Sequence, residues 1–238
     1  DFDYFAGGAL LKPNGADGDK ESLYDRAEKA GYKVVNTQAE AEKISDKDEK
    51  VLLISEKLAD GDSISYENDR ANGEWALSDY VDKGIEVLSD NEKGFFMMVE
   101  GGKIDWACHA NDAGSAINDT IALADAVDEA VEFANEHPDE TLILVTGDHE
   151  TGGLTIGYAG TDYDTYLTNL TNQKISYAKF DTDYVAKYKE NQTSFEDMMK
   201  DVEELFGLKM SGAEDDKLVL TEYEIGLLKD AYAKTLAD

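Results

Sequence analysis

Two apolar runs joined by a long amphipathic segment constrain the fold of this chain more than any other feature. The runs are GFFMMVE at residues 94–100 and TLILVTGDH at residues 141–149. Continuous apolar runs of this length are typical of strands buried on both faces of a parallel sheet. Between them, apolar residues recur every three or four positions over residues 111–137, which predicts a long helix. Strand, helix and strand in this order indicate a parallel βαβ unit.

The residues before this unit continue the alternation. Helical patterns occur over residues 19–31, 37–45 and 73–89, and short strand-like runs over residues 32–36 and 51–55. Segments that alternate in this way are typical of α/β folds. We therefore expect a mostly parallel sheet flanked by helices.

The sequence changes character after about residue 160, where it becomes polar and rich in tyrosine. Helical spacing of apolar residues recurs there in two segments, 194–208 and 220–236. Ser194 and Thr221 stand near their starts, as residues that cap helices do. We therefore expect an α/β half over residues 1–159 and an appended, mainly helical region over residues 160–238.

The charge balance excludes two classes of partner. With 22 basic and 53 acidic residues, the formal net charge is −31. Such a surface repels the phosphates of nucleic acids and anionic membranes, so we expect neither as a partner. The chain has no run of about 20 apolar residues, so we expect no membrane span. Adaptation to salt and a need for solubility remain equally good explanations of the acidity.

Carboxylate and imidazole side chains follow both apolar runs. Glu100 and Asp148 come at the ends of the two predicted strands, at the edge of an open parallel sheet where ligands bind. Asp105 and His109 are four residues apart, so a helix would place them on one face, and His149 adjoins Asp148. Carboxylate–imidazole pairs suit Zn²⁺, an all-oxygen site suits Mg²⁺, and two neighbouring metals indicate phosphoryl-type hydrolysis.

Each of these residues also has a simpler interpretation. An Asp-His pair can be a hydrogen-bonded loop, and Glu100 before two glycines can be a turn residue. His137, at a helix end before Pro138, is expected to be solvated. Cys108 is the only cysteine, which excludes an internal disulfide; we expect a small buried residue, with zinc binding by its thiolate as the alternative.

The blocks around these residues resemble the alkaline phosphatase family. The resemblance is strongest in residues 94–114 and 141–153 and extends more weakly over about residues 2–157. It implies a site with two zinc ions and one magnesium ion. The residues that match the family's ligands are Asp105 and His109 for the first zinc, Asp148 and His149 for the second zinc, and Glu100 for magnesium. Trp106 matches a variable position that tunes the magnesium site, and a packing aromatic is the alternative.

The resemblance also implies an activity and a location. Members of the family hydrolyse phosphate monoesters through a phosphoserine intermediate. They are usually exported to the periplasm or the cell surface, and the resemblance allows a homodimer. Members of the same superfamily, of the phosphoglycerate mutase or sulfatase type, remain an alternative. A non-catalytic acidic module that binds cations loosely is a second alternative.

Several parts of the family's site have no match in this chain. The serine nucleophile, its neighbouring aspartate and the phosphate-binding arginine are missing, because Arg26 and Arg70 lie outside any matching motif. No histidine follows His149 to complete the first zinc site. Because the chain begins with Asp1 and shows no signal peptide, we expect a segment of a longer enzyme, with the missing N-terminal half as a partner. We expect no catalytic nucleophile in it, weak zinc binding and negligible activity alone.

Overall fold

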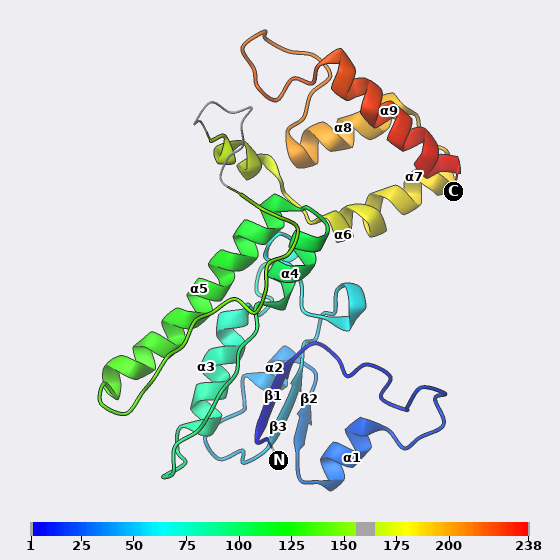
Figure 1. Cartoon of the computed structure of the whole chain (residues 1–238). Helices are drawn as coiled ribbons and strands as arrows, with labels where there is room; N and C mark the ends of the chain where they lie inside the picture. Colours follow the sequence, from blue (N-terminus) through cyan, green and yellow to red (C-terminus); the bar gives the residue numbers. More distant parts are fainter. Residues whose placement is uncertain (1, 156–164, 238) are drawn as a thin grey trace. The chain divides into compact units, whose positions relative to one another are not determined.

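The computed structural model describes residues 2–155 and 165–237 (Figure 1). The chain forms two compact units, each made of two stretches of sequence. Unit 1 comprises Asp1–Ile104 and Asn118–His149, and unit 2 comprises Asp105–Ile117 and Glu150–Asp238. The predicted boundary between residues 159 and 160 lies outside the described residues.

Unit 1 contains a parallel three-stranded sheet. Its strands are β1 (Tyr4–Gly7), β2 (Lys33–Val35) and β3 (Val51–Ile54), in the order β1-β3-β2. Both outer strands pair with β3, and all four residues of β3 are buried, as expected for the central strand of a parallel sheet. The strands predicted over residues 32–36 and 51–55 are confirmed, and β1 is an addition to them.

Short and long helices accompany this sheet. They are α1 (Leu23–Lys29), α2 (Gln38–Ala41) and α3 (Leu77–Leu88), with two 3₁₀ helices, η1 (Asp60–Asp62) and η2 (Glu67–Asp69). Tyr80 and Val87 of α3 share a buried apolar cluster with Val51 and Leu53 of β3. Burial of each such side chain contributes about 1.5–3 kcal/mol, so the cluster holds α3 against the sheet. The three helices predicted before residue 90 are therefore present, with narrower bounds.

Two helices contribute residues to both units. They are α4 (Gly102–His109) and α5 (Ala113–Glu136). Asp112 caps α5, because its carboxylate accepts a hydrogen bond from the Ser115 N–H at 3.0 Å. The helix ends two residues before Pro138, whose ring cannot continue it. The long helix predicted over residues 111–137 is confirmed.

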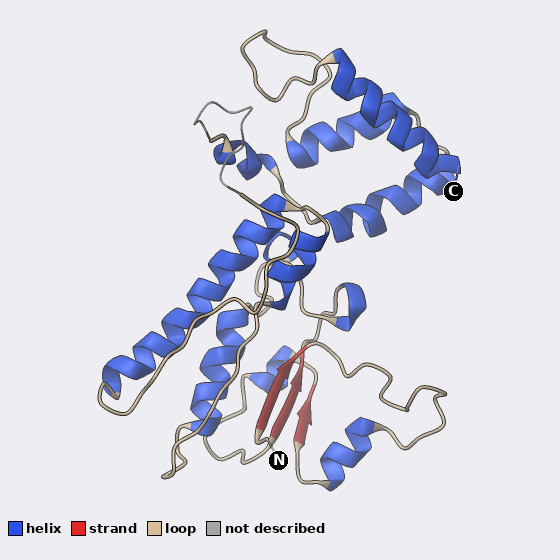
Figure 2. Ribbon diagram, viewed as in Figure 1, coloured by secondary structure: helices blue, strands red, loops and turns tan. Residues whose placement is uncertain are grey.

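The prediction of two further buried strands is wrong. Residues 94–100 and 141–149 contain no strand, and Figure 2 draws them as loops. Half-buried and exposed side chains alternate over residues 95–98 and 141–144, so these stretches are covered on one side only, whereas residues 99–100 and 145–149 are all exposed. A strand ladder needs a neighbouring backbone, and no described residue supplies one here.

The C-terminal part of unit 2 is helical, and its helices pack on one another. They are η4 (Leu167–Asn172), α6 (Tyr177–Phe180), the π-helix η5 (Asp181–Val185), α7 (Ala186–Asn191), α8 (Phe195–Phe206) and α9 (Glu222–Ala237). Ser194 accepts the Asp197 N–H at 3.1 Å and Thr221 accepts the Glu224 N–H at 3.3 Å, so both predicted N-caps are confirmed. Among the described residues, no helix has the length and apolar character needed to cross a bilayer.

Candidate metal centre

Helix α4 presents Asp105 and His109 one turn apart. Their four-residue separation places them on one face of the helix, as predicted. His109 Nε2 lies 3.5 Å from Asp105 Oδ1, and both side chains are accessible to solvent. The first aspartate–histidine pair therefore exists as a local feature of α4.

A glycine-rich turn braces this pair within unit 2. Thr151 Oγ1 donates a hydrogen bond to Asp105 Oδ1 at 2.8 Å. Gly152 follows with a φ of 74°, and a Cβ at this position would lie 2.2 Å from the Cys108 carbonyl oxygen. Only glycine allows this approach. Neither Thr151 nor Gly152 was predicted as part of the site, although the two consecutive glycines after Thr151 are a signal for a tight turn.

The second pair, Asp148 and His149, belongs to unit 1. His149 Nε2 lies 3.5 Å from Asp148 Oδ2, and the His149 N–H donates to Asp148 Oδ1 at 3.0 Å. Both side chains are exposed. The backbone hydrogen bond is the capped-loop arrangement that was the simpler interpretation of these residues, and it coexists with the side-chain pair.

Glu100 is exposed at the start of α4, in unit 1. A Cβ on Gly102 would lie 3.6 Å from Glu100 Oε1, so the carboxylate lies over the first turn of the helix. A Cβ on Gly101 would lie 2.8 Å from Ile104 and 3.2 Å from Leu123, so this glycine lets the chain pass close to α5. Gly101 is therefore the position where a side chain would crowd its neighbours, whereas the Glu100 carboxylate lies at ordinary contact distance from the Gly102 position.

The spacing of the donor atoms in both pairs fits zinc. Because Zn–N and Zn–O bonds are about 2.0–2.2 Å, two ligands of a tetrahedral zinc ion lie about 3.3–3.5 Å apart. Both aspartate–histidine pairs have donor atoms 3.5 Å apart. Each pair offers two ligands, and zinc sites take three or four. Over residues 2–155 and 165–237, no three His, Cys, Asp or Glu side chains form one group that could hold a metal. Convergence of all five predicted ligands stays a prediction.

The remaining residues considered for the site have different environments. Burial, followed by the carboxylates of Asp105 and Glu150, raises the pKa of the Cys108 thiol and so disfavours a zinc-binding thiolate. Trp106 is about one-third exposed on α4. His137 is exposed beyond α5 and its ring contacts that of Phe133 in a tilted arrangement, with centroids 4.4 Å apart, so its predicted place at a solvated helix end is confirmed.

A buried polar network fixes the first turn of α4 in unit 1. Lys103 Nζ lies 2.6 Å from Asp60 Oδ1 and 4.0 Å from the centroid of the Tyr66 ring. Asp119 of α5 is also buried and accepts the Glu67 N–H at 3.3 Å. Burial is the main cause that raises the pKa of Asp119 to about 7. This network holds the residue two positions before Asp105.

Comparison with known proteins shows the family to which this chain belongs. A family model described as alkaline phosphatase matches residues 4–215, which is most of the chain. The chain belongs to the alkaline phosphatase family. The match includes every predicted metal ligand and continues well beyond residue 157, into the helical region.

Individual alkaline phosphatases resemble this chain over part of their length. Alkaline phosphatase 3 of Bacillus subtilis is 31% identical over 210 residues, which cover 88% of this chain and 40% of that protein. Alkaline phosphatase 4 of the same organism is 39% identical over 139 residues, covering 58% of this chain and 29% of that protein. The crystal structure of a cold-active alkaline phosphatase from Shewanella sp. superposes with a TM-score of 0.74 at 28% identity, covering 98% of this chain and 51% of that one. The chain therefore spans about half or less of these alkaline phosphatases.

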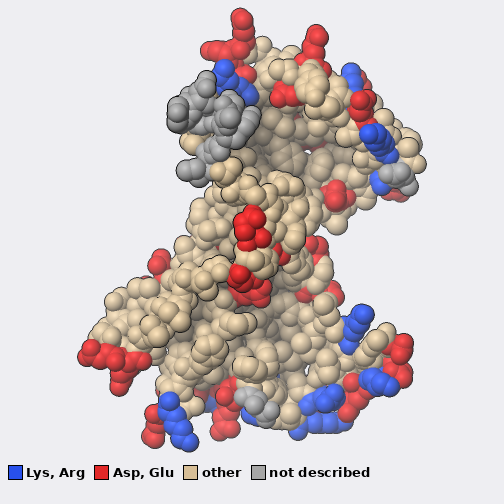
Figure 3. Space-filling model, viewed as in Figure 1, with Lys and Arg blue, Asp and Glu red and all other residues tan. Residues whose placement is uncertain are grey.

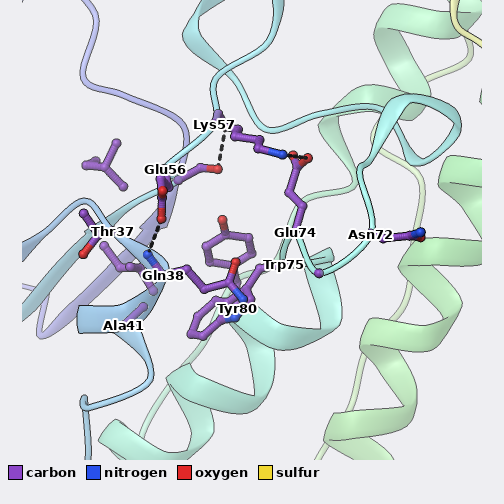
Figure 4. Close-up of a pocket in the computed structure, with 13 residues that line it drawn as sticks. Thr37, Gln38, Ala41, Glu56, Lys57, Asn72, Glu74, Trp75 and Tyr80 are labelled. Carbon is purple, nitrogen blue, oxygen red and sulfur yellow. Dashed lines mark hydrogen bonds and ion pairs between the residues drawn. The ribbon is translucent and has the colours of Figure 1, made fainter.

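A pocket of about 120 Å³ lies elsewhere in unit 1, beside the end of β3 (Figure 4). The Gln38 N–H donates to Glu56 at its rim, and Lys57 lies 3.9 Å from the Glu74 carboxylate. None of the predicted metal ligands lines this pocket. It is therefore separate from the residues that match the alkaline phosphatase metal sites.

Proposed function

We propose that this chain supplies metal ligands to an alkaline phosphatase that hydrolyses phosphate monoesters through a phosphoserine intermediate. The observation that carries the proposal is the presence of two aspartate–histidine pairs with zinc-like donor spacing inside the family match. Asp105 and His109 would bind one zinc ion, Asp148 and His149 a second, and Glu100 a magnesium ion.

The chain's own side chains orient these ligands. Thr151 donates to Asp105, and a hydrogen bond of this kind holds a ligating carboxylate in position. Imidazoles ligate only when neutral, so acidic solution is expected to weaken binding by His109 and His149. When bound, zinc activates a hydroxyl nucleophile and stabilises the charge of the phosphoryl group. Trp106 would tune the magnesium site next to Asp105.

The rest of the reaction would come from polypeptide outside this chain. The resemblance assigns the serine nucleophile and the phosphate-binding arginine to a half that this chain does not match. Arg70 is unsuited to bind phosphate, because Glu67 holds its guanidinium through two hydrogen bonds of 2.8 and 2.6 Å. We therefore propose weak zinc binding and negligible hydrolysis for the chain alone. By the same resemblance, the complete enzyme would be a periplasmic or cell-surface protein, with a homodimer as its allowed assembly.

Zinc affinity tests the ligand assignment. We expect His109→Ala and His149→Ala each to weaken zinc binding about tenfold or more, because each removes one ligand of a pair. His137→Ala is the matched control and should bind zinc as the wild type does. Affinity is measured by competition with a chromophoric chelator, and circular dichroism checks folding. Equal affinity in all four proteins would show diffuse binding to the acidic surface and overturn the assignment.

Turnover of paired chromogenic esters tests the reaction class. We expect hydrolysis of a phosphate monoester, and little hydrolysis of the matching sulfate ester, only when the missing half is supplied. A preference for the sulfate ester would favour the sulfatase alternative. Rapid, chelator-sensitive phosphate hydrolysis by the 238-residue chain alone would contradict the proposed need for a second half.

A further inference from the structure

Two Asn-Gly sequences occur in this chain, and the structure holds them differently. They are Asn14-Gly15 and Asn72-Gly73, both in unit 1. An asparagine side chain before glycine is readily attacked by the next backbone nitrogen, because glycine has no side chain to block the approach. The attack needs two freedoms: the asparagine amide must reach the next nitrogen, and the peptide between the two residues must rotate. The contacts around each sequence decide whether it has them.

The sequence Asn14-Gly15 lacks both freedoms. The Gly15 N–H donates to the Lys12 carbonyl at 2.8 Å. The Asn14 side-chain amide donates to the Lys20 carbonyl at 3.1 Å, and the Lys20 N–H donates to the Asn14 carbonyl at 2.9 Å. A Cβ on Gly15 would lie 2.7 Å from Lys20 Cγ, so the glycine is also closely packed. The nitrogen that would attack and the amide that it would attack are therefore both held.

The sequence Asn72-Gly73 forms the tip of a tight turn whose two ends are held by hydrogen bonds. The Glu74 N–H donates to the Ala71 carbonyl at 3.0 Å, which closes the turn. The Ala71 N–H donates back to the Glu74 carboxylate at 3.1 Å. The Arg70 guanidinium donates to the Glu74 carbonyl at 3.0 Å. These bonds fix the residues on either side of the tip.

The two residues at the tip of this turn have both freedoms. Within the described residues, no hydrogen bond involves the Asn72 side chain or the Gly73 N–H. Gly73 has a φ of 80°, as the third residue of a type II turn requires, and the space around it is open. Rotation of the peptide between the two residues converts a type II turn into a type I turn and keeps the bond that closes it. In Figure 4 the Asn72 side chain points away from Glu74 and Trp75.

We propose that Asn72 is a site of self-catalysed deamidation and that the structure protects Asn14 from the same reaction. The Gly73 nitrogen loses its proton and forms a bond to Cγ of Asn72. The Cγ–N bond of the side-chain amide breaks and ammonia leaves, which gives a succinimide ring. Water then opens the ring at Cγ, which gives aspartate, or at the α-carbonyl, which gives isoaspartate with the chain continuing through Cβ. The overall reaction consumes water and releases ammonia, without an oxidant or reductant.

The reaction would change the wall of the pocket beside β3. Asn72 and Gly73 both line this pocket, together with Glu56 and Glu74. Either product places a new carboxylate there, and isoaspartate also lengthens the backbone of the turn. Figure 3 shows carboxylates over unit 1 on one face of the molecule, so the reaction adds negative charge to a unit that already carries it. None of the predicted metal ligands lines the pocket, so the proposed function does not depend on this reaction.

Peptide mapping of the aged chain tests the proposal. Trypsin places the two sequences on separate peptides, residues 1–20 and 71–83, and each peptide contains a single asparagine. The folded 238-residue chain is incubated at mildly alkaline pH, which favours the deprotonated nitrogen, and mass spectrometry follows the deamidated fraction of each peptide. We expect Asn72 to deamidate about tenfold faster than Asn14 or more, because hydrogen bonds must first open at Asn14.

Two controls separate the effect of structure from that of sequence. In denaturant the hydrogen bonds are lost, so both asparagines should deamidate at similar rates. Asn72→Gln would have to close a larger ring, so it should keep the circular dichroism spectrum and remove most of the isoaspartate that forms in the folded chain. Asn14→Gln is the matched control and should leave that isoaspartate unchanged.

Three results would overturn the proposal. The first is an equal rate at the two asparagines of the folded chain, because the hydrogen bonds at Asn14 would then give no protection. The second is isoaspartate formation that Asn72→Gln leaves unchanged, because the reaction would then occur elsewhere. The third is a difference between the two rates that persists in denaturant, because the sequence rather than the structure would then set the rates.

Discussion

At Gly152 the backbone turns so close to α4 that its neighbour Thr151 can reach Asp105. The φ of Gly152 is 74°, a conformation that side-chain-bearing residues rarely adopt, and the Cys108 carbonyl occupies the space of a Cβ. Gly153 has nearly the same φ, 72°, but open space around it. The two adjacent glycines thus separate the effect of backbone conformation from that of close packing.

We predict that Gly152→Ala is more harmful than Gly153→Ala. Both changes strain a left-handed backbone by about 1 kcal/mol, and only the first also pushes against the Cys108 carbonyl. Gly152→Ala should therefore lower the melting temperature more and weaken zinc binding through displacement of Thr151. Thermal melts and zinc competition on both variants measure this. Equal losses of melting temperature and zinc affinity in the two variants would show that the close contact of Gly152 with the Cys108 carbonyl does not affect stability.

The buried carboxyl of Asp119 makes a pH-dependent contribution to stability. Burial and the nearby Glu67 and Asp69 raise its folded pKa to about 7, while Lys103 and the Glu67 N–H oppose the rise. Since this pKa lies above the ordinary value of 3.8, the folded state binds the extra proton between about pH 4 and 7. Its contribution to stability is therefore lost as the pH rises through this window.

We predict that Asp119→Asn removes this pH dependence. Between pH 5 and 8 the wild type should lose on the order of 2–3 kcal/mol of unfolding free energy relative to the variant, because each pKa unit is worth about 1.4 kcal/mol. Asp125→Asn, at an exposed position of the same helix, is the control and should follow the wild type. Denaturant titrations at the two pH values provide the measurement. Parallel pH responses of wild type and Asp119→Asn would contradict the prediction.

Among the elements, α5 depends on a cap that also ties together distant parts of unit 2. The Asp112 carboxylate accepts hydrogen bonds from the Ser115 backbone and hydroxyl, from Gln173 at 2.5 Å and from the Tyr177 N–H at 2.8 Å. It is buried, so its loss would leave several donors without an acceptor. The Ser194 cap of α8, by contrast, is a local and exposed bond.

We predict that Asp112→Ala costs more than Ser194→Ala. Removal of an exposed cap costs about 1 kcal/mol, whereas buried donors left without acceptors add about 1–3 kcal/mol. Asp112→Ala should also speed hydrogen exchange at the start of α6, where Tyr177 lies. Denaturant unfolding and amide exchange of both variants test this. A similar cost for the two variants would mean that the links to Gln173 and Tyr177 add nothing.

Helices were predictable from the sequence to a greater extent than strands. The hydrogen bonds of a helix are local, so the apolar spacing and the caps Ser194 and Thr221 were enough to place α8 and α9. A strand needs a partner that is distant in sequence. The apolar run at residues 51–55 pairs with β1 and β2, whereas the apolar run within residues 141–149 pairs with no strand among the residues that the structure describes. An apolar pattern alone does not distinguish these two cases.

At the scale of the whole molecule, the contacts of the candidate site also fall into two groups: contacts between residues close in sequence, which were predictable, and contacts between distant residues, which were not. The Asp105–His109 pair follows from a four-residue spacing, and Asp148–His149 from adjacency, so both were predictable. The hydrogen bond from Thr151 to Asp105 spans 46 residues and that from Glu67 to Asp119 spans 52. No local sequence pattern predicts either of them. The family resemblance was predictable because it rests on contiguous blocks of residues, and the family match confirms it.

The strand order β1-β3-β2 has a consequence for how the chain comes off the ribosome. Within the part of the chain that the structure describes, β1 and β2 each pair only with β3, the last of the three to be made. During synthesis, β1 and β2 must therefore stay unpaired until Ile54 clears the exit tunnel. A nascent chain arrested before that point would contain β1 and β2 but not β3, the strand that joins them.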